Sequence, residues 1–147
     1  MIMANILGIP DPDFALLVLI TEILLVSVLL TGWYFGARRL NLDVHHGAVY
    51  GAISIQVLIV GTWMLPRFLR AASFVLSDII GRLPVVLHVI CGTLTVINGL
   101  FLTILFLIRR DIPLKILRRA RPFMITELIV WTITLALGTL NFVNRYG

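Results

Sequence analysis

Histidine and glutamate side chains stand inside long apolar stretches of this 147-residue chain, where such groups can bind a metal, ligate haem or transfer a proton. His88 lies near the start of the run LPVVLHVICGTLTVINGLFLTILFLIRR, and Glu22 and Gln56 lie within two earlier apolar runs. A carboxyl near the middle of a membrane span costs several kcal/mol when it is charged and unpaired. Glu22 is therefore expected to be neutral, paired or bound to a ligand.

The depth of these residues along their helices predicts two polar layers. A helix rises about 1.5 Å per residue through a hydrocarbon core of about 30 Å, which allows each depth to be placed. The outer layer, a candidate cofactor site, contains His88, Glu22 and Gln56. The inner layer, a candidate metal site, contains His45, His46 and Glu127.

Structural roles are open for the same side chains. His88 can be a structural histidine that bonds to Glu22 or to a backbone carbonyl. Glu127 can pair with Arg121 or with a histidine.

Depth also limits how haem could bind. His46 and His88 are separated by about 15 to 20 Å of membrane depth, whereas two axial ligands must meet one iron. Haem or a metal would therefore require a second chain, a ligand other than histidine such as Glu22, or the adjacent pair His45 and His46.

The composition indicates the elements that hold these groups. With 60% hydrophobic residues, 13% charged residues and a mean hydropathy of +1.06, the chain is expected to be an integral membrane protein. It forms a single domain, 1–147, with predicted spans at about 14–35, 44–65, 84–108 and 123–142. Short connections favour an all-α, four-transmembrane-helix up-down bundle. The connection 67–82 suits a short interfacial helix between the second and third spans.

Helical periodicity predicts which faces look inward. One face of the third span carries His88, Gly92, Thr95, Gly99 and Thr103. One face of the fourth span carries Glu127, Trp131, Thr134, Gly138 and Asn141. A stripe of small residues in the second span, expected to allow close helix contact, contains Gly47, Gly51, Ser54 and Gly61.

The formal charge of +5 reflects basic residues clustered at the ends of apolar runs. The first-to-second and third-to-fourth connections hold Arg38, Arg39, Arg109, Arg110, Lys115, Arg118, Arg119 and Arg121. The positive-inside rule then predicts both termini outside and anionic lipid at the inner loops, and nucleic-acid binding is not expected. The single cysteine, Cys91, rules out an internal disulfide, and the N-terminus lacks the features of a cleaved signal peptide.

Three segments between about Leu42 and Val143 carry a family resemblance: LDVHHGAVYGAISIQVLIVGTW, LPVVLHVICGTLTVINGL and RRARPFMITELIVWTITLALGTL. They resemble the small four-helix membrane proteins of the CtaM and YozB type, which are associated with assembly or maturation of haem-copper terminal oxidases. His45 or His46 stands where that family has a histidine opening a span, and His88 matches its intramembrane histidine. The family's histidine before the last span is missing from Lys115 to Arg121, and the histidine near the end of its second span is also absent. The resemblance leaves haem b or copper open as a cofactor, and the sequence requires neither.

These features together favour a non-catalytic accessory subunit or assembly factor of a membrane redox metalloenzyme in a prokaryotic cell membrane. Its expected partners are membrane helices of a larger redox complex. A haem-copper respiratory oxidase is the first candidate complex and a membrane copper monooxygenase the second. Self-association into a homo-oligomer is a further alternative. The alternatives are a b-type cytochrome-like electron carrier and a small proton or ion transporter. Independent enzyme activity is not expected, because the chain has no phosphate loop, no nucleophile with a matched base and no His-x-x-x-His pair.

Overall fold

The computed structural model describes residues 11–108 and 114–147, and these are helical with no strand. The elements are α2 (Asp11–Arg38), α3 (Leu42–Ile59), the π-helical segment η1 (Val60–Met64), α4 (Leu65–Leu76), α5 (Leu83–Ile108) and α6 (Leu114–Tyr146). Four stretches are long and apolar enough to cross a membrane: Pro12–Arg38, Leu42–Leu76, Leu83–Ile108 and Arg121–Tyr146. The prediction of an all-helical protein with four candidate membrane spans is confirmed.

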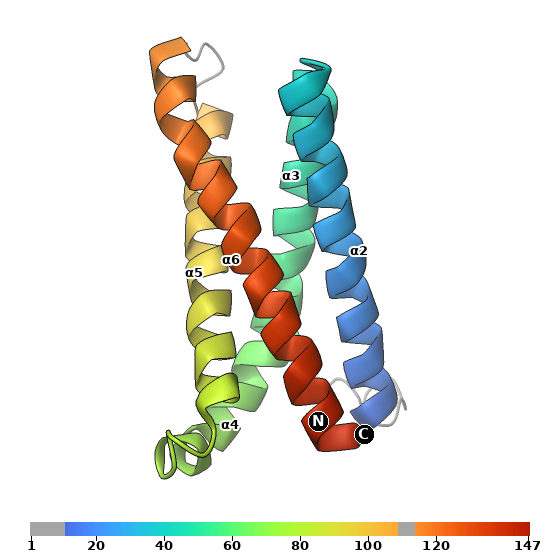
Figure 1. Ribbon diagram of the computed structural model, residues 1–147, viewed down its shortest axis with the longest axis vertical. Helices are drawn as coiled ribbons and strands as arrows, with labels where there is room; N and C mark the ends of the chain where they lie inside the picture. Colours follow the sequence, from blue (N-terminus) through green and yellow to red (C-terminus); the bar gives the residue numbers. More distant parts are fainter. Residues whose placement is uncertain (1–10, 109–113) are drawn as a thin grey trace.

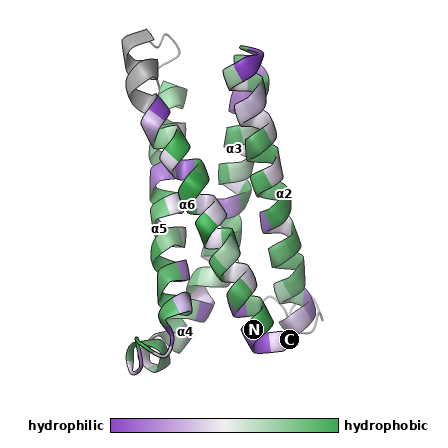
Figure 2. Cartoon of the chain, in the orientation of Figure 1, coloured by the Kyte–Doolittle hydropathy of each residue, from purple (hydrophilic) through white to green (hydrophobic). Residues whose placement is uncertain are grey.

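The four long helices alternate in direction, and the first turn of α2 lies at the same end of the molecule as the last turn of α6 (Figure 1). Helices α2 and α3 pack as one hairpin, and α5 and α6 pack as a second. The hairpins meet where α6 crosses toward α2 and where α3 contacts α5. Figure 2 shows mostly apolar residues along the helices, with hydrophilic residues at the helix ends and at a few places midway.

The second long helix does not end at Leu65 as predicted. It continues through η1 into α4, where Pro66 occupies the first turn. Proline has no N–H and its ring crowds the carbonyl four residues earlier, so the helix widens, with the Leu65 N–H bonding to the Val60 carbonyl. A separate short helix between the second and third spans is therefore not confirmed: α4 continues α3, and an interfacial position for it stays a prediction.

The fourth helix also extends past its predicted boundary. It begins at Leu114, so Pro122 lies inside α6 rather than before it. Proline removes one backbone hydrogen bond, which a helix of this length tolerates near its end. Arg109 and Arg110, together with the side chains of Lys115, Arg118 and Arg119, lie outside the described part of the chain. The orientation of the termini therefore stays a prediction from the sequence.

Glycines on α2 bring the first hairpin into close contact. A Cβ built at Gly32 would lie 2.7 Å from the Ala48 Cβ, and one at Gly36 would lie 2.9 Å from the His45 ring. Both distances are shorter than a van der Waals contact, so only glycine fits there at this helix separation.

The small-residue stripe of α3 does not make the contact predicted for it. A Cβ at Gly47, Gly51 or Gly61 would meet no atom within 4 Å, and Ser54 is exposed. The stripe faces away from the bundle because α3 packs on α2 through Ala48 and buries Ala52 and Ile53. Within the described residues, this face of α3 has no helix against it.

The apolar core lies midway along the bundle and joins three helices. Its buried residues are Leu25, Val26, Leu29, Ala52, Ile53 and Trp131. Trp131 has no exposed surface, so its indole N–H needs an acceptor inside the protein.

Candidate functional site

The centre of the site is a polar contact among three helices. Trp131 on α6 donates its Nε1–H to Oε2 of Glu22 on α2, at 3.1 Å. The side chain of Gln56 on α3 lies close enough to the Glu22 carboxyl to interact with it. Glu22 is 6% exposed and Gln56 3% exposed, so water is largely excluded from this contact. The predicted grouping of Glu22 with Gln56 therefore occurs, and Trp131 is a third member that depth alone did not identify.

This contact leaves acceptors unpaired. Glu22 Oε1 and Gln56 Oε1 are buried and have no hydrogen-bond partner among the described residues. A buried oxygen without a donor costs about 1–3 kcal/mol, so a proton, a water molecule or a ligand at this point would stabilise the group. The network is therefore able to accept one more hydrogen bond.

His88 has a different partner from the other two residues predicted for the outer layer. Its Nδ1 lies 3.0 Å from the backbone oxygen of Thr134, and its ring lies against Gly138. A carbonyl only accepts, so Nδ1 must donate. Of the structural alternatives for His88, the bond to a backbone carbonyl is the one that forms. Through α6, His88 lies about one helical turn from Trp131.

The inward faces predicted for the third and fourth spans are confirmed. Thr95 and Gly99 are buried on α5, and Gly92 faces Thr134. On α6, Glu127 and Trp131 are buried as well. At the end of this face, Asn141 donates to the Pro84 carbonyl at 3.4 Å.

A second polar contact lies nearer the other end of the bundle. Asn98 on α5 donates to Oε2 of Glu127 at 2.7 Å and lies 3.3 Å from the Phe123 carbonyl. Glu127 Oε1 is buried without a partner and faces Gly99. Glu127 thus pairs with an amide rather than with Arg121 or a histidine, and Arg121 is exposed. The spacing of polar residues in the third span could have suggested Asn98 as the partner.

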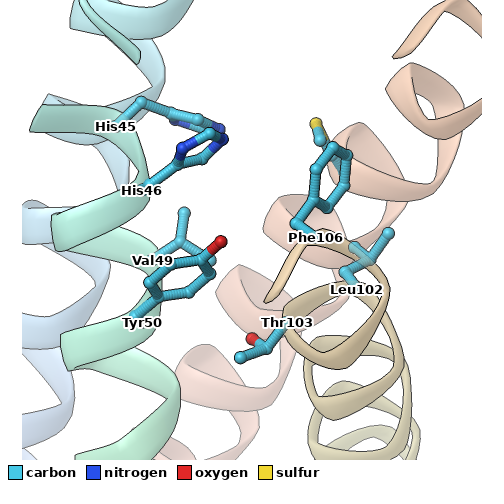
Figure 3. A pocket seen from close by; sticks show the side chains of 8 residues that line it. His45, His46, Val49, Tyr50, Leu102, Thr103 and Phe106 are labelled. Atoms are coloured by element: carbon cyan, nitrogen blue, oxygen red, sulfur yellow. The ribbon is translucent and has the colours of Figure 1, made fainter. Parts of the chain in front are cut away.

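The two adjacent histidines open onto a small cavity between α3 and the second hairpin (Figure 3). Its volume is about 30 Å³. Its lining consists of His45, His46, Val49, Tyr50, Leu102, Thr103, Phe106 and Met124. The His46 ring stacks on Tyr50 with centroids 5.7 Å apart and tilts against Phe106 at 5.9 Å.

The cavity does not contain the metal set predicted for the inner layer. Glu127 does not line it, and no cluster of three or more His, Cys, Asp or Glu residues forms among the described residues. His45 and His46 therefore share their cavity with a thioether and two hydroxyl groups instead of a carboxylate. The volume also excludes a porphyrin, because pockets for larger ligands measure about 300 Å³ or more.

Comparison with protein-family models, with curated proteins and with solved structures finds no match to this chain.

Proposed function

We propose that this chain is a non-catalytic accessory subunit or assembly factor of a membrane redox metalloenzyme, with a haem-copper respiratory oxidase as its first candidate partner. One observation carries the partner-binding part of this proposal, namely the open small-residue face of α3. It consists of Gly47, Gly51, Ser54 and Gly61.

Small residues on a membrane helix let a second helix approach closely, and packing at such faces drives helix association in lipid. Inside this chain the close approaches use other glycines, such as Gly32 and Gly36, so the α3 face is left for a helix of another chain. The redox class of the partner rests on the resemblance of the segments around His46 and His88 to oxidase-assembly proteins. A membrane copper monooxygenase would use the same face.

The test is affinity isolation of the full chain from its native membrane in mild detergent, with identification of the co-purifying subunits. We expect oxidase subunits at fixed stoichiometry with the unaltered chain and their loss with Gly51→Leu. Because Gly51 faces open space, this substitution should not lower the protein's own stability.

The matched control is Ala136→Leu, which adds similar bulk at an exposed position on α6. Retention of the partner by Gly51→Leu, or equal loss with Ala136→Leu, would rule out the α3 face. Co-purification with subunits that belong to no redox complex would contradict the proposed class of partner.

A proton or ion transporter is the second candidate, because buried oxygens without partners occur at both polar contacts. They belong to Glu22, Gln56 and Glu127. The two carboxyl groups could each carry a proton, and all three oxygens could accept a hydrogen bond from water along the bundle axis. Proteoliposomes containing the purified chain would show flux driven by a pH gradient, reduced in Glu22→Gln. Absence of flux, or flux unaffected by this change, would remove the candidate.

A further inference from the structure

The cavity in Figure 3 brings together three side chains that neither polar network uses. The His45 and His46 rings both extend from α3 toward the cavity (Figure 3). Met124, a residue of α6, also lines the cavity. Thioether sulfur favours the soft ion Cu(I), and imidazole nitrogen also binds copper well. We propose that His45, His46 and Met124 bind one Cu(I) ion.

The hydrogen bond of His45 prepares its ring for this role. Nδ1 lies 3.1 Å from the Gly32 carbonyl, and because a carbonyl only accepts, Nδ1 carries the hydrogen. Nε2 then keeps its lone pair for a ligand. A bond from the other ring nitrogen to a backbone carbonyl is the usual support of a metal-binding histidine.

Contacts with neighbouring aromatic rings, rather than hydrogen bonds, hold the His46 ring in place. It contacts Tyr50 and Phe106, and neither of its nitrogens has a hydrogen-bond partner among the described residues. The ring is thus oriented while a nitrogen remains available. Asp43 lies close enough to interact electrostatically with His46, which places a negative charge beside the site.

The size and the remaining lining of the cavity limit what can bind. About 30 Å³ accommodates one ion or one water molecule. Leu102 and Phe106 supply apolar walls, which suit Cu(I) better than a strongly hydrated divalent ion. A structural zinc site would require four ligands rich in thiolate, imidazole or carboxylate, and the cavity lining has no thiolate or carboxylate.

The biological role of this site rests on the proposed function, because an accessory protein of a copper enzyme would bind copper in order to supply or stabilise that enzyme. Its chemistry, however, is testable on the isolated protein. Failure to bind Cu(I) would leave the partner experiment unaffected. Loss of the partner would leave the copper titration unaffected.

The experiment is a Cu(I) titration of the full chain, purified in detergent without a polyhistidine tag, in competition with the chromogenic chelator bathocuproine disulfonate. We expect one Cu(I) per chain and a loss of affinity of more than about tenfold in both Met124→Leu and His46→Asn. Copper X-ray absorption should show nitrogen and sulfur neighbours, with the sulfur lost in Met124→Leu.

Two matched variants serve as controls. Met64→Leu changes a methionine packed against Phe14 and Trp63, away from the cavity, and should bind as the unaltered chain does. Met3→Leu tests the N-terminal methionines as a competing source of thioether. Circular dichroism and unfolding midpoints verify that the variants are folded.

Several results would overturn the site. These are a stoichiometry below one, unchanged affinity in Met124→Leu, loss of binding in Met3→Leu instead, or a spectrum without a sulfur neighbour. Preferential binding of Zn(II) in a parallel titration would contradict the chemistry of the ligands.

Discussion

The contact between Gly32 on α2 and Ala48 on α3 offers the sharpest test of the packing. In Gly32→Ala the new methyl group would lie 2.7 Å from the Ala48 Cβ, and neither methyl can rotate away. Carbon atoms prefer a separation of about 3.5–4.0 Å, so the helices must move apart by about 1 Å. Overpacking of this kind costs about 1–3 kcal/mol.

Gly51→Ala is the matched control, because it makes the same substitution in a helix where the new methyl meets no atom. The helix-propensity gain of about 0.5–1 kcal/mol is common to both variants and cancels in their difference. We therefore expect Gly32→Ala to be less stable than Gly51→Ala by about 1–3 kcal/mol, or about 5- to 150-fold in the unfolding equilibrium constant.

The assay is unfolding of the purified protein in mixed detergent micelles with increasing sodium dodecyl sulfate, followed by circular dichroism. The double variant Gly32→Ala/Ala48→Gly moves the methyl group to the opposite helix and should recover most of the loss. Equal stability of Gly32→Ala and Gly51→Ala would refute the close approach of α2 and α3, and so would a double variant no better than Gly32→Ala.

Three further predictions concern the polar contacts and use the same unfolding assay. Glu22→Gln keeps an oxygen for the Trp131 N–H and should change stability by less than about 1 kcal/mol, whereas Glu22→Leu leaves that donor unpaired and should cost about 1–3 kcal/mol. Asn98→Leu removes the donor to Glu127 and should cost about 1–3 kcal/mol, a loss that Glu127→Leu in the same chain should largely relieve. His88→Leu removes one bond to the α6 backbone and should cost about 0.5–1.5 kcal/mol. Equal effects of Glu22→Gln and Glu22→Leu would contradict the bond from Trp131 to Glu22. A double variant at 98 and 127 that is no more stable than Asn98→Leu would contradict the bond from Asn98 to Glu127. Unchanged stability in His88→Leu would contradict the bond from His88 to the α6 backbone.

The apolar runs in the sequence correctly located the helices, but they did not locate the helix ends that were predicted next to prolines. The predicted spans ended at 65 and began at 123, next to Pro66 and Pro122, yet both helices continue through these prolines. Proline forbids only one hydrogen bond, and a long apolar helix keeps its ladder on either side.

The partners of the polar groups show the same limit. Depth placed Glu22 near Gln56, because rise along a helix is a property of the chain itself. It did not identify Trp131 as the donor to Glu22, since that contact depends on α6 crossing toward α2. Likewise, Met124 joins His45 and His46 only through the packing of the two hairpins.

By itself, the sequence determined the membrane class, the four candidate spans and the inward faces of α5 and α6, because apolar length and helical periodicity are local. Only the tertiary structure decided which small residues are in contact and which are open. A glycine stripe permits another helix to approach closely, but it does not determine which helix does so. In this protein α2 packs on α3 through Gly32 and Ala48, and Gly51 faces outward. The rotation of α3 about its axis is settled by the helices that pack against it, and the glycine stripe in its sequence does not encode that rotation.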